Sequence, residues 1–87
     1  QAKGAAEEKA TTASAAIDAA REALGKVRKT SRNRADRARW QSEIDGLSAT
    51  LEDANDYVTS GNYDQAVGYF DTVLKECDRI QTEISGS

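Results

Sequence analysis

Uncharged, mostly apolar side chains recur at alternating intervals of three and four residues along almost the whole chain. On an α-helix this spacing places the side chains along one side, where they can pack against neighbouring helices. Three segments each carry one such series, and no charged residue falls on any position of it. The series are Ala6, Ala10, Ala13, Ile17, Ala20, Leu24, Val27; Trp40, Ile44, Leu47, Leu51, Ala54, Val58; and Tyr63, Ala66, Phe70, Val73, Cys77, Ile80, Ile84.

Two short polar stretches separate the three series and indicate where helices end. The first contains Asn33, whose side chain can cap the helix that follows. In the second, Gly61 suits the left-handed position just after a helix, and Asn62 can cap the next one. We therefore predict helices at about residues 3–30, 33–60 and 62–84.

Short connections between consecutive helices favour antiparallel neighbours. The sequence therefore predicts an all-α fold, an up-down-up antiparallel three-helix bundle, with residues 1–87 as a single helical-bundle domain. The absence of proline and the many alanines favour helices in the same way. This packing places Tyr63 and Phe70 opposite the small residues near the start of the chain. At the other end it places Trp40 against four aliphatic side chains, Leu24, Val27, Ile80 and Ile84.

Three glycines, Gly25, Gly46 and Gly68, lie inside the predicted helices. A glycine in a helix interior lowers stability by about 1 kcal/mol relative to alanine. Two interpretations are open at this point. Each glycine either permits close approach of a partner backbone or is simply tolerated at the surface.

Positive charge is concentrated in one stretch of a chain whose net charge is −3. Residues 26–39 carry a net charge of +6, whereas residues 1–25 carry −1 and residues 40–87 carry −8. In the predicted bundle this stretch forms one tip, with its first three cations in the last turn of the first helix, where they complement the helix dipole. The opposite tip is acidic. The candidate partner-binding residues are Lys26, Arg28, Lys29, Arg32, Arg34, Arg37 and Arg39.

Four uses of this basic cluster are compatible with the sequence. It can be a solvated connection, a docking patch for an acidic protein surface, which includes the acidic tip of another copy, a nucleic-acid contact or a contact for anionic lipid headgroups. The overall acidity and the lack of interleaved aromatic residues argue against nucleic acid. We therefore expect a structural or protein-interaction module that docks through this tip, within a larger or self-associating assembly. A nucleic-acid-binding accessory protein using the same residues is the alternative.

Several kinds of chemistry lack the residues they need. The sequence contains no histidine, which removes the usual general base and the commonest metal ligand. Cys77 lies on the third series, where burial keeps a thiol inert, and a reactive thiol is the alternative. Glu52, Asp56 and Asp64 either form a solvated acidic surface or hold a hard cation weakly. No glycine-rich phosphate loop occurs, and we expect a protein that is not an enzyme and uses no cofactor or metal.

Residues 54–74 resemble the helical hairpin of a tetratricopeptide repeat. The stretch GNYDQAVGYFDTVL has Gly61, Tyr63, Ala66 and Phe70 at the G-x-Y-x-x-A-x-x-x-F spacing of that family. Such arrays need several copies of the repeat, and the chain contains one. The resemblance implies a shared way of closing a helical hairpin.

The whole chain is also similar to small Ala-rich helical domains of exported bacterial envelope proteins. Their A-x-x-x-[VI]-x-x-G-x-Y-x-x-A pattern is matched by Ala54, Val58, Gly61, Tyr63 and Ala66. The resemblance implies a periplasmic or cell-envelope location after cleavage of an export signal, which fits a chain that begins at Gln1; a shortened recombinant chain is the other explanation. No apolar run approaches the roughly 18–20 residues that span a bilayer, so we expect no membrane span.

Overall fold

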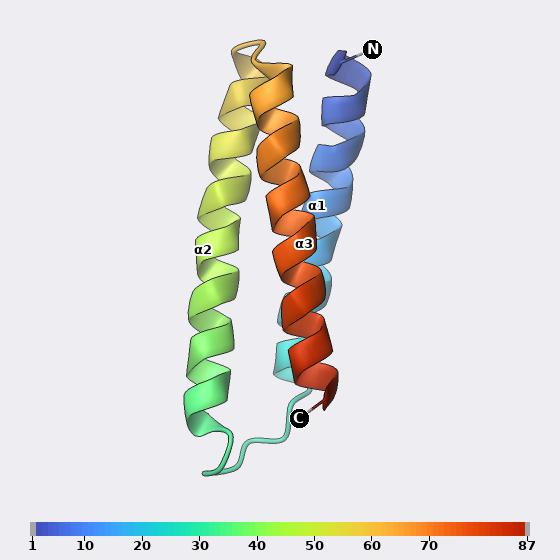
Figure 1. Cartoon of the computed structure of the whole chain (residues 1–87). Helices are drawn as coiled ribbons and strands as arrows, with labels where there is room; N and C mark the ends of the chain where they lie inside the picture. The colour runs from blue at the N-terminus through green and yellow to red at the C-terminus, as the bar shows by residue number, and fades with distance from the viewer. Residues whose placement is uncertain (1, 87) are drawn as a thin grey trace.

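The computed structural model describes residues 2–86, which form three helices joined by two connections. Helix α1 spans Ala2–Gly25, α2 spans Arg34–Thr59 and α3 spans Tyr63–Gly86. The chain runs along the bundle three times in alternating directions, and each helix packs against both others (Figure 1). The predicted all-α, up-down-up three-helix bundle is confirmed.

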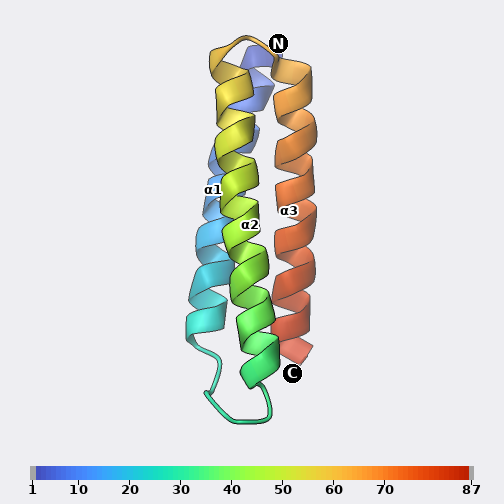
Figure 2. The same cartoon turned by 90° about the vertical axis from the view of Figure 1, so that its left-hand side faces the viewer.

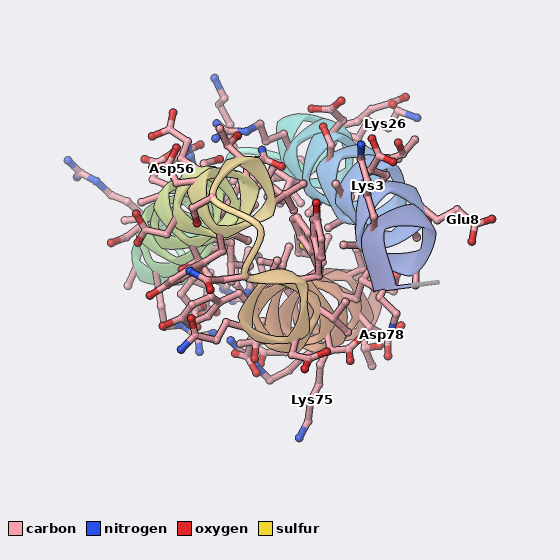
Figure 3. All side chains as sticks on the ribbon, turned by 90° about the horizontal axis from the view of Figure 1, so that it is seen from above. Lys3, Glu8, Lys26, Asp56, Lys75 and Asp78 are labelled. Atoms are coloured by element: carbon pink, nitrogen blue, oxygen red, sulfur yellow. The ribbon has the colours of Figure 1, made fainter. Side chains whose placement is uncertain are left out.

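The core lies along the central axis, where side chains from all three helices converge (Figure 3). Every buried hydrophobic residue within residues 2–86 belongs to one of the three series with alternating spacing. The remaining members of the series are half-buried. The largest fully buried side chains are Trp40, Phe70, Ile44, Ile80, Val73 and Cys77.

The two ends of the core differ in the size of the residues that fill them. At the end near the N-terminus, Phe70 is fully buried and α1 contributes the buried alanines Ala6 and Ala13. At the other end, Leu24, Val27 and Ile84 pack against the cluster that contains Trp40 and Ile80. The antiparallel arrangement thus pairs small side chains with large ones.

The connection between α2 and α3 is a tight turn closed by Gly61. Its φ of 86° is the left-handed conformation that favours glycine. The amide of Gly61 donates to the carbonyl of Val58 (3.1 Å) and that of Asn62 to the carbonyl of Tyr57 (2.8 Å). These two bonds are the Schellman arrangement for ending a helix, so the predicted role of Gly61 is confirmed.

Helix α1 ends at Gly25, and the prediction that it continues to about residue 30 is wrong. The last turn tightens, because the amide of Lys26 bonds to the carbonyls of Glu22 and Ala23 and that of Val27 to the carbonyl of Leu24. The placement of Lys26, Arg28 and Lys29 in the last helical turn is therefore also wrong. These three residues belong to the connection, where side-chain hydrogen bonds replace those of a helix.

Asn33 organises that connection in a way the sequence did not predict. It occupies the position before α2, but its side chain does not cap the helix. Its Oδ1 accepts a bond from the amide of Thr30 (3.1 Å), whose Oγ1 accepts one from the amide of Asn33 (3.3 Å). Its Nδ2 donates to the carbonyl of Arg28 (2.6 Å). This reciprocal pair resembles a capping box placed one turn ahead of the helix.

The glycines of the predicted helices are surface positions. Gly46 and Gly68 lie inside α2 and α3, and Gly25 is the last residue of α1. A Cβ atom added at any of the three meets no heavy atom within 4 Å. No neighbouring helix of this chain therefore requires glycine at these positions.

The bundle is a rod of 47 × 17 × 14 Å. The connection between α1 and α2 lies at one end, and the connection between α2 and α3 lies at the other, next to the start of α1 (Figure 2). The rod thus has two separate tips with different composition. No helix within residues 2–86 has the length and apolar character needed to cross a membrane.

Candidate functional site

The seven predicted partner-binding residues gather at the end of the rod that holds the first connection. We call this set the basic tip: Lys26, Arg28, Lys29, Arg32, Arg34, Arg37 and Arg39. The first four lie in the connection, and the last three lie in the first two turns of α2. The fold therefore brings them to one extremity of the molecule (Figure 1).

Three members of the basic tip are held by groups of the same chain. Lys26 pairs with Glu22 one turn earlier (3.2 Å). Arg37 donates from Nε to Asn33 Oδ1 (2.8 Å) and from Nη2 to the carbonyl of Thr30 (3.4 Å). The two contacts of Arg37 hold the connection against the start of α2, so Arg37 stabilises the local structure.

Arg39 is the third engaged member. Its Nη2 lies 3.2 Å from Glu83 Oε1 and 3.5 Å from Asp36 Oδ1. Its guanidinium carbon lies 5.8 Å from the ring centre of Trp40, within the range of a cation–π contact. Arg39 thus joins the start of α2 to the end of α3.

The other four members are available to a partner. Arg28, Lys29, Arg32 and Arg34 are exposed. None of the four side chains has a hydrogen bond or an ion pair within the part of the chain that the structure describes. The predicted cluster thus divides into a group that supports the connection and a group of four unpaired cations.

The unpaired cations border two open concavities on either side of the connection. One, of about 440 Å³, is lined by Lys29, Arg34 and Arg37 together with Arg21 and Leu24. The other, of about 550 Å³, is lined by charged and apolar side chains of the connection and by the end of α3, among them Arg28, Arg32, Val27 and Ile84. Positive charge therefore borders apolar surface here, which is a composition found where proteins meet.

A charged cluster between α2 and α3 adjoins the basic tip. It was not predicted from the sequence. Arg79 donates to Glu43 (2.6 Å), Glu76 (2.9 Å) and Glu83 (2.6 Å). Hydrogen bonding to Glu43 and then to Glu76 and Glu83 raises the pKa of Arg79. The spacing of Glu76 and Glu83 around Arg79 signals the two contacts within α3, whereas the contact with Glu43 depends on the packing of two helices.

The pKa of Glu83 is lowered within this cluster. The main cause is the hydrogen bond from the indole of Trp40, followed by the hydrogen bond from Arg79. Arg39 adds a smaller electrostatic contribution. Glu83 is therefore held as a carboxylate, and it neutralises part of the positive charge at this end of the rod.

Cys77 is buried in the core and has no disulfide partner. Burial raises the pKa of its thiol, and the charge of Glu76 raises it further. A thiol in this state reacts slowly. The structure therefore gives Cys77 the environment of a packing residue.

The acidic end of the rod carries Glu52, Asp53, Asp56 and Asp64. All four are exposed. Within residues 2–86, no three carboxylate or thiol groups gather closely enough to hold a metal ion. The carboxylates that the sequence offered as weak cation ligands therefore do not converge on one point.

Together the fold and the two tips define a class, an all-α three-helix bundle with charges of opposite sign at its two ends. Comparison of the chain with protein families, with curated proteins and with solved structures finds no match.

Proposed function

We propose that this protein is a non-enzymatic interaction module that docks through its basic tip on an acidic protein surface. The observation that supports this is the division among its cations. Lys9, Arg21 and Arg79 each pair with a carboxylate of another helix. In contrast, four cations cluster at the first connection and the start of α2 without a hydrogen bond or an ion pair from their side chains within residues 2–86: Arg28, Lys29, Arg32 and Arg34. Lys3 and Lys75 are also unpaired in this range, but each lies alone on α1 or α3.

The composition of the tip favours a protein partner over nucleic acid. Three of the four unpaired cations are arginines, which bind carboxylates through two parallel hydrogen bonds. The apolar side chains of Leu24 and Val27 line the same concavities. Nucleic-acid sites commonly add exposed aromatic rings, whereas Trp40, the aromatic residue nearest the tip in sequence, is only 2% exposed.

The resemblance to Ala-rich domains of exported envelope proteins supports a role within a larger assembly. In such a setting the protein docks through its basic tip on a neighbouring component. A periplasmic or cell-envelope location belongs to the same proposal.

Binding to three probes tests the proposal: polyglutamate, a DNA duplex and vesicles containing phosphatidylserine. Arg32→Glu/Arg34→Glu reverses two unpaired cations of the tip. Lys3→Glu/Lys75→Glu is the matched control, because it changes net charge equally at two exposed lysines. Of these, Lys75 extends away from the bundle (Figure 3). We expect polyglutamate binding to weaken at least about tenfold in the tip variant and to change little in the control.

Other outcomes overturn the proposal. A steep fall of duplex affinity with salt, without polyglutamate binding, assigns the tip to nucleic acid. Binding to the vesicles alone assigns it to lipid headgroups. Equal effects of the tip variant and the control mean that overall charge, not the tip, controls binding.

A further inference from the structure

Two tyrosines pair on the surface between α2 and α3, close to the acidic end of the rod. The rings of Tyr57 and Tyr69 are stacked, with centres 5.3 Å apart and planes inclined by 21°. Tyr69, at 41%, is the large hydrophobic side chain most exposed to solvent within residues 2–86. The remaining large apolar side chains of the described chain are at least half-buried, so this ring is the most accessible of them to a partner.

Two carboxylates line an open concavity together with the tyrosine pair. Asp53, Asp56, Ser60 and both tyrosines line this concavity of about 520 Å³. Asp56 lies at the outer surface of α2 (Figure 3), and neither aspartate forms an ion pair within residues 2–86. Hydrogen bonding to Tyr69 raises the pKa of Tyr57, and the negative charge of Asp53 adds to this effect. Tyr57 is therefore neutral at physiological pH and lies in a negative environment.

This combination matches the chemistry of an arginine side chain. A guanidinium stacks on an aromatic ring with one face and donates paired hydrogen bonds to a carboxylate with its edge. The concavity offers both an exposed ring and two unpaired carboxylates. A lysine ammonium uses the ring less well and lacks the planar pair of donors.

We propose that the concavity of Tyr57, Tyr69, Asp53 and Asp56 receives an arginine from the basic tip of a second copy of this chain. We call these four residues the receiving site. The inference rests on the proposed function, because it names the acidic surface on which the tip docks. The occupant follows from charge: the tip presents unpaired arginines, and the receiving site presents unpaired carboxylates.

The positions of the two surfaces determine the form of the assembly. The basic tip and the receiving site lie toward opposite ends of a rod 47 Å long. A single chain cannot bring them together without unfolding, so the contact joins two copies head to tail. Such a contact leaves one free tip and one free receiving site at each stage, so it adds further copies until the chain of rods closes into a ring or stays open.

Sedimentation equilibrium of the whole chain at low and high salt tests the inference. We expect the average mass to rise with protein concentration at low salt and to fall back at about 0.5 M salt, where charges are screened. Tyr69→Leu keeps an apolar side chain but removes the ring, and it should weaken association about threefold or more. Asp53→Asn/Asp56→Asn should weaken it about tenfold or more.

Charge exchange tests whether these two surfaces touch each other. Reversal of all four unpaired cations makes the tip acidic, because it changes the net charge of residues 26–39 from +6 to −2: Arg28→Glu, Lys29→Glu, Arg32→Glu and Arg34→Glu. Asp53→Arg/Asp56→Arg makes the receiving site basic. We expect each variant alone to stay monomeric, because like charges then face each other. An equimolar mixture should associate again, since each variant restores the partner that the other lacks. Lys3→Glu/Lys75→Glu should associate like the wild type, and circular dichroism checks that all variants remain helical.

The outcomes separate this inference from the proposed function. A wild type that stays monomeric at every concentration and salt overturns the inference, while polyglutamate binding by the tip leaves the proposed function standing. Association that is unchanged by Tyr69→Leu and by the aspartate changes also overturns the inference, because the contact then involves other residues. A mixture of the charge-exchanged variants that stays monomeric contradicts the pairing of the two surfaces.

Discussion

The indole nitrogen of Trp40 donates a hydrogen bond of 3.0 Å to Oε1 of Glu83, which connects the start of α2 to the end of α3. The ring of Trp40 is only 2% exposed and fills the core. Glu83 also accepts a bond from Arg79 and pairs with Arg39. The pair therefore links the apolar interior to the charged groups beside the basic tip.

Truncating this tryptophan should be the most damaging single change at this end of the rod. Trp40→Ala removes a buried ring and should lower the free energy of unfolding by about 3–5 kcal/mol. Trp40→Phe keeps most of the apolar surface and loses the N–H donor, so we expect a loss of about 1–3 kcal/mol. Urea denaturation followed by circular dichroism measures both. Equal losses for the two variants would contradict the role assigned to the ring.

Glu83 should make stability depend on pH in the acid range. Its pKa in the folded protein lies below the usual 4.5, so folding favours the ionised form. The resulting stabilisation is complete above pH 4.5 and is lost as the pH falls through the lowered folded value. Glu83→Gln should therefore be less stable than the wild type at pH 7 and show a smaller loss on acidification.

Urea denaturation of both proteins between neutral and acid pH measures this difference. Asp18→Asn offers a control, because Asp18 is exposed on α1 and has no ion pair within residues 2–86. Profiles of wild type and Glu83→Gln that run parallel at all pH values would rule out the assignment.

Glycine-to-alanine changes should have opposite effects at different positions. Gly46 and Gly68 lie within helices, and an added Cβ meets nothing within 4 Å. Each change to alanine there should raise the free energy of unfolding by about 0.5–1 kcal/mol. Gly61→Ala forces a side chain into the left-handed conformation and should lower it by about 1–2 kcal/mol. Thermal and urea denaturation measure the three variants, and stabilisation by Gly61→Ala would contradict the turn geometry.

Removing the side chain of Asn33 should loosen the first connection. Asn33→Ala loses bonds to Thr30, Arg28 and Arg37 and should cost about 1–2 kcal/mol of stability. Asn55→Ala is the matched control, because Asn55 is exposed on α2 and its side chain has no hydrogen bond within residues 2–86. We expect the control to change stability by less than about 0.5 kcal/mol. Hydrogen exchange of residues 26–33 should accelerate only in Asn33→Ala.

The core could be predicted from the sequence because it depends on spacing alone. Alternating steps of three and four place Ile44 and Leu47 on one side of α2, and Phe70 and Val73 on one side of α3, whatever each helix packs against. The turn at Gly61 is equally local, since a left-handed residue after a helix favours glycine in any fold. These features need only the geometry of a short segment.

The end of α1 could not be predicted in this way. Periodicity continues through Leu24 to Val27, yet the helix stops at Gly25. Thr30 and Asn33 offer the backbone competing hydrogen bonds. The residue at which α1 ends depends on the path that the connection must take to reach the start of α2.

The candidate site also combines features that could be predicted from the sequence with features that could not. The position of the seven cations at one tip follows from the sequence, because the order of charges and the order of helices are both linear. The engagement of Arg37 and Arg39 within the chain, the lack of partners for Arg32 and Arg34, and the stacking of Tyr57 on Tyr69 became apparent from the packed structure. Contacts of this kind depend on how helices are rotated and shifted against one another, and this comes from packing the whole core rather than from any one segment.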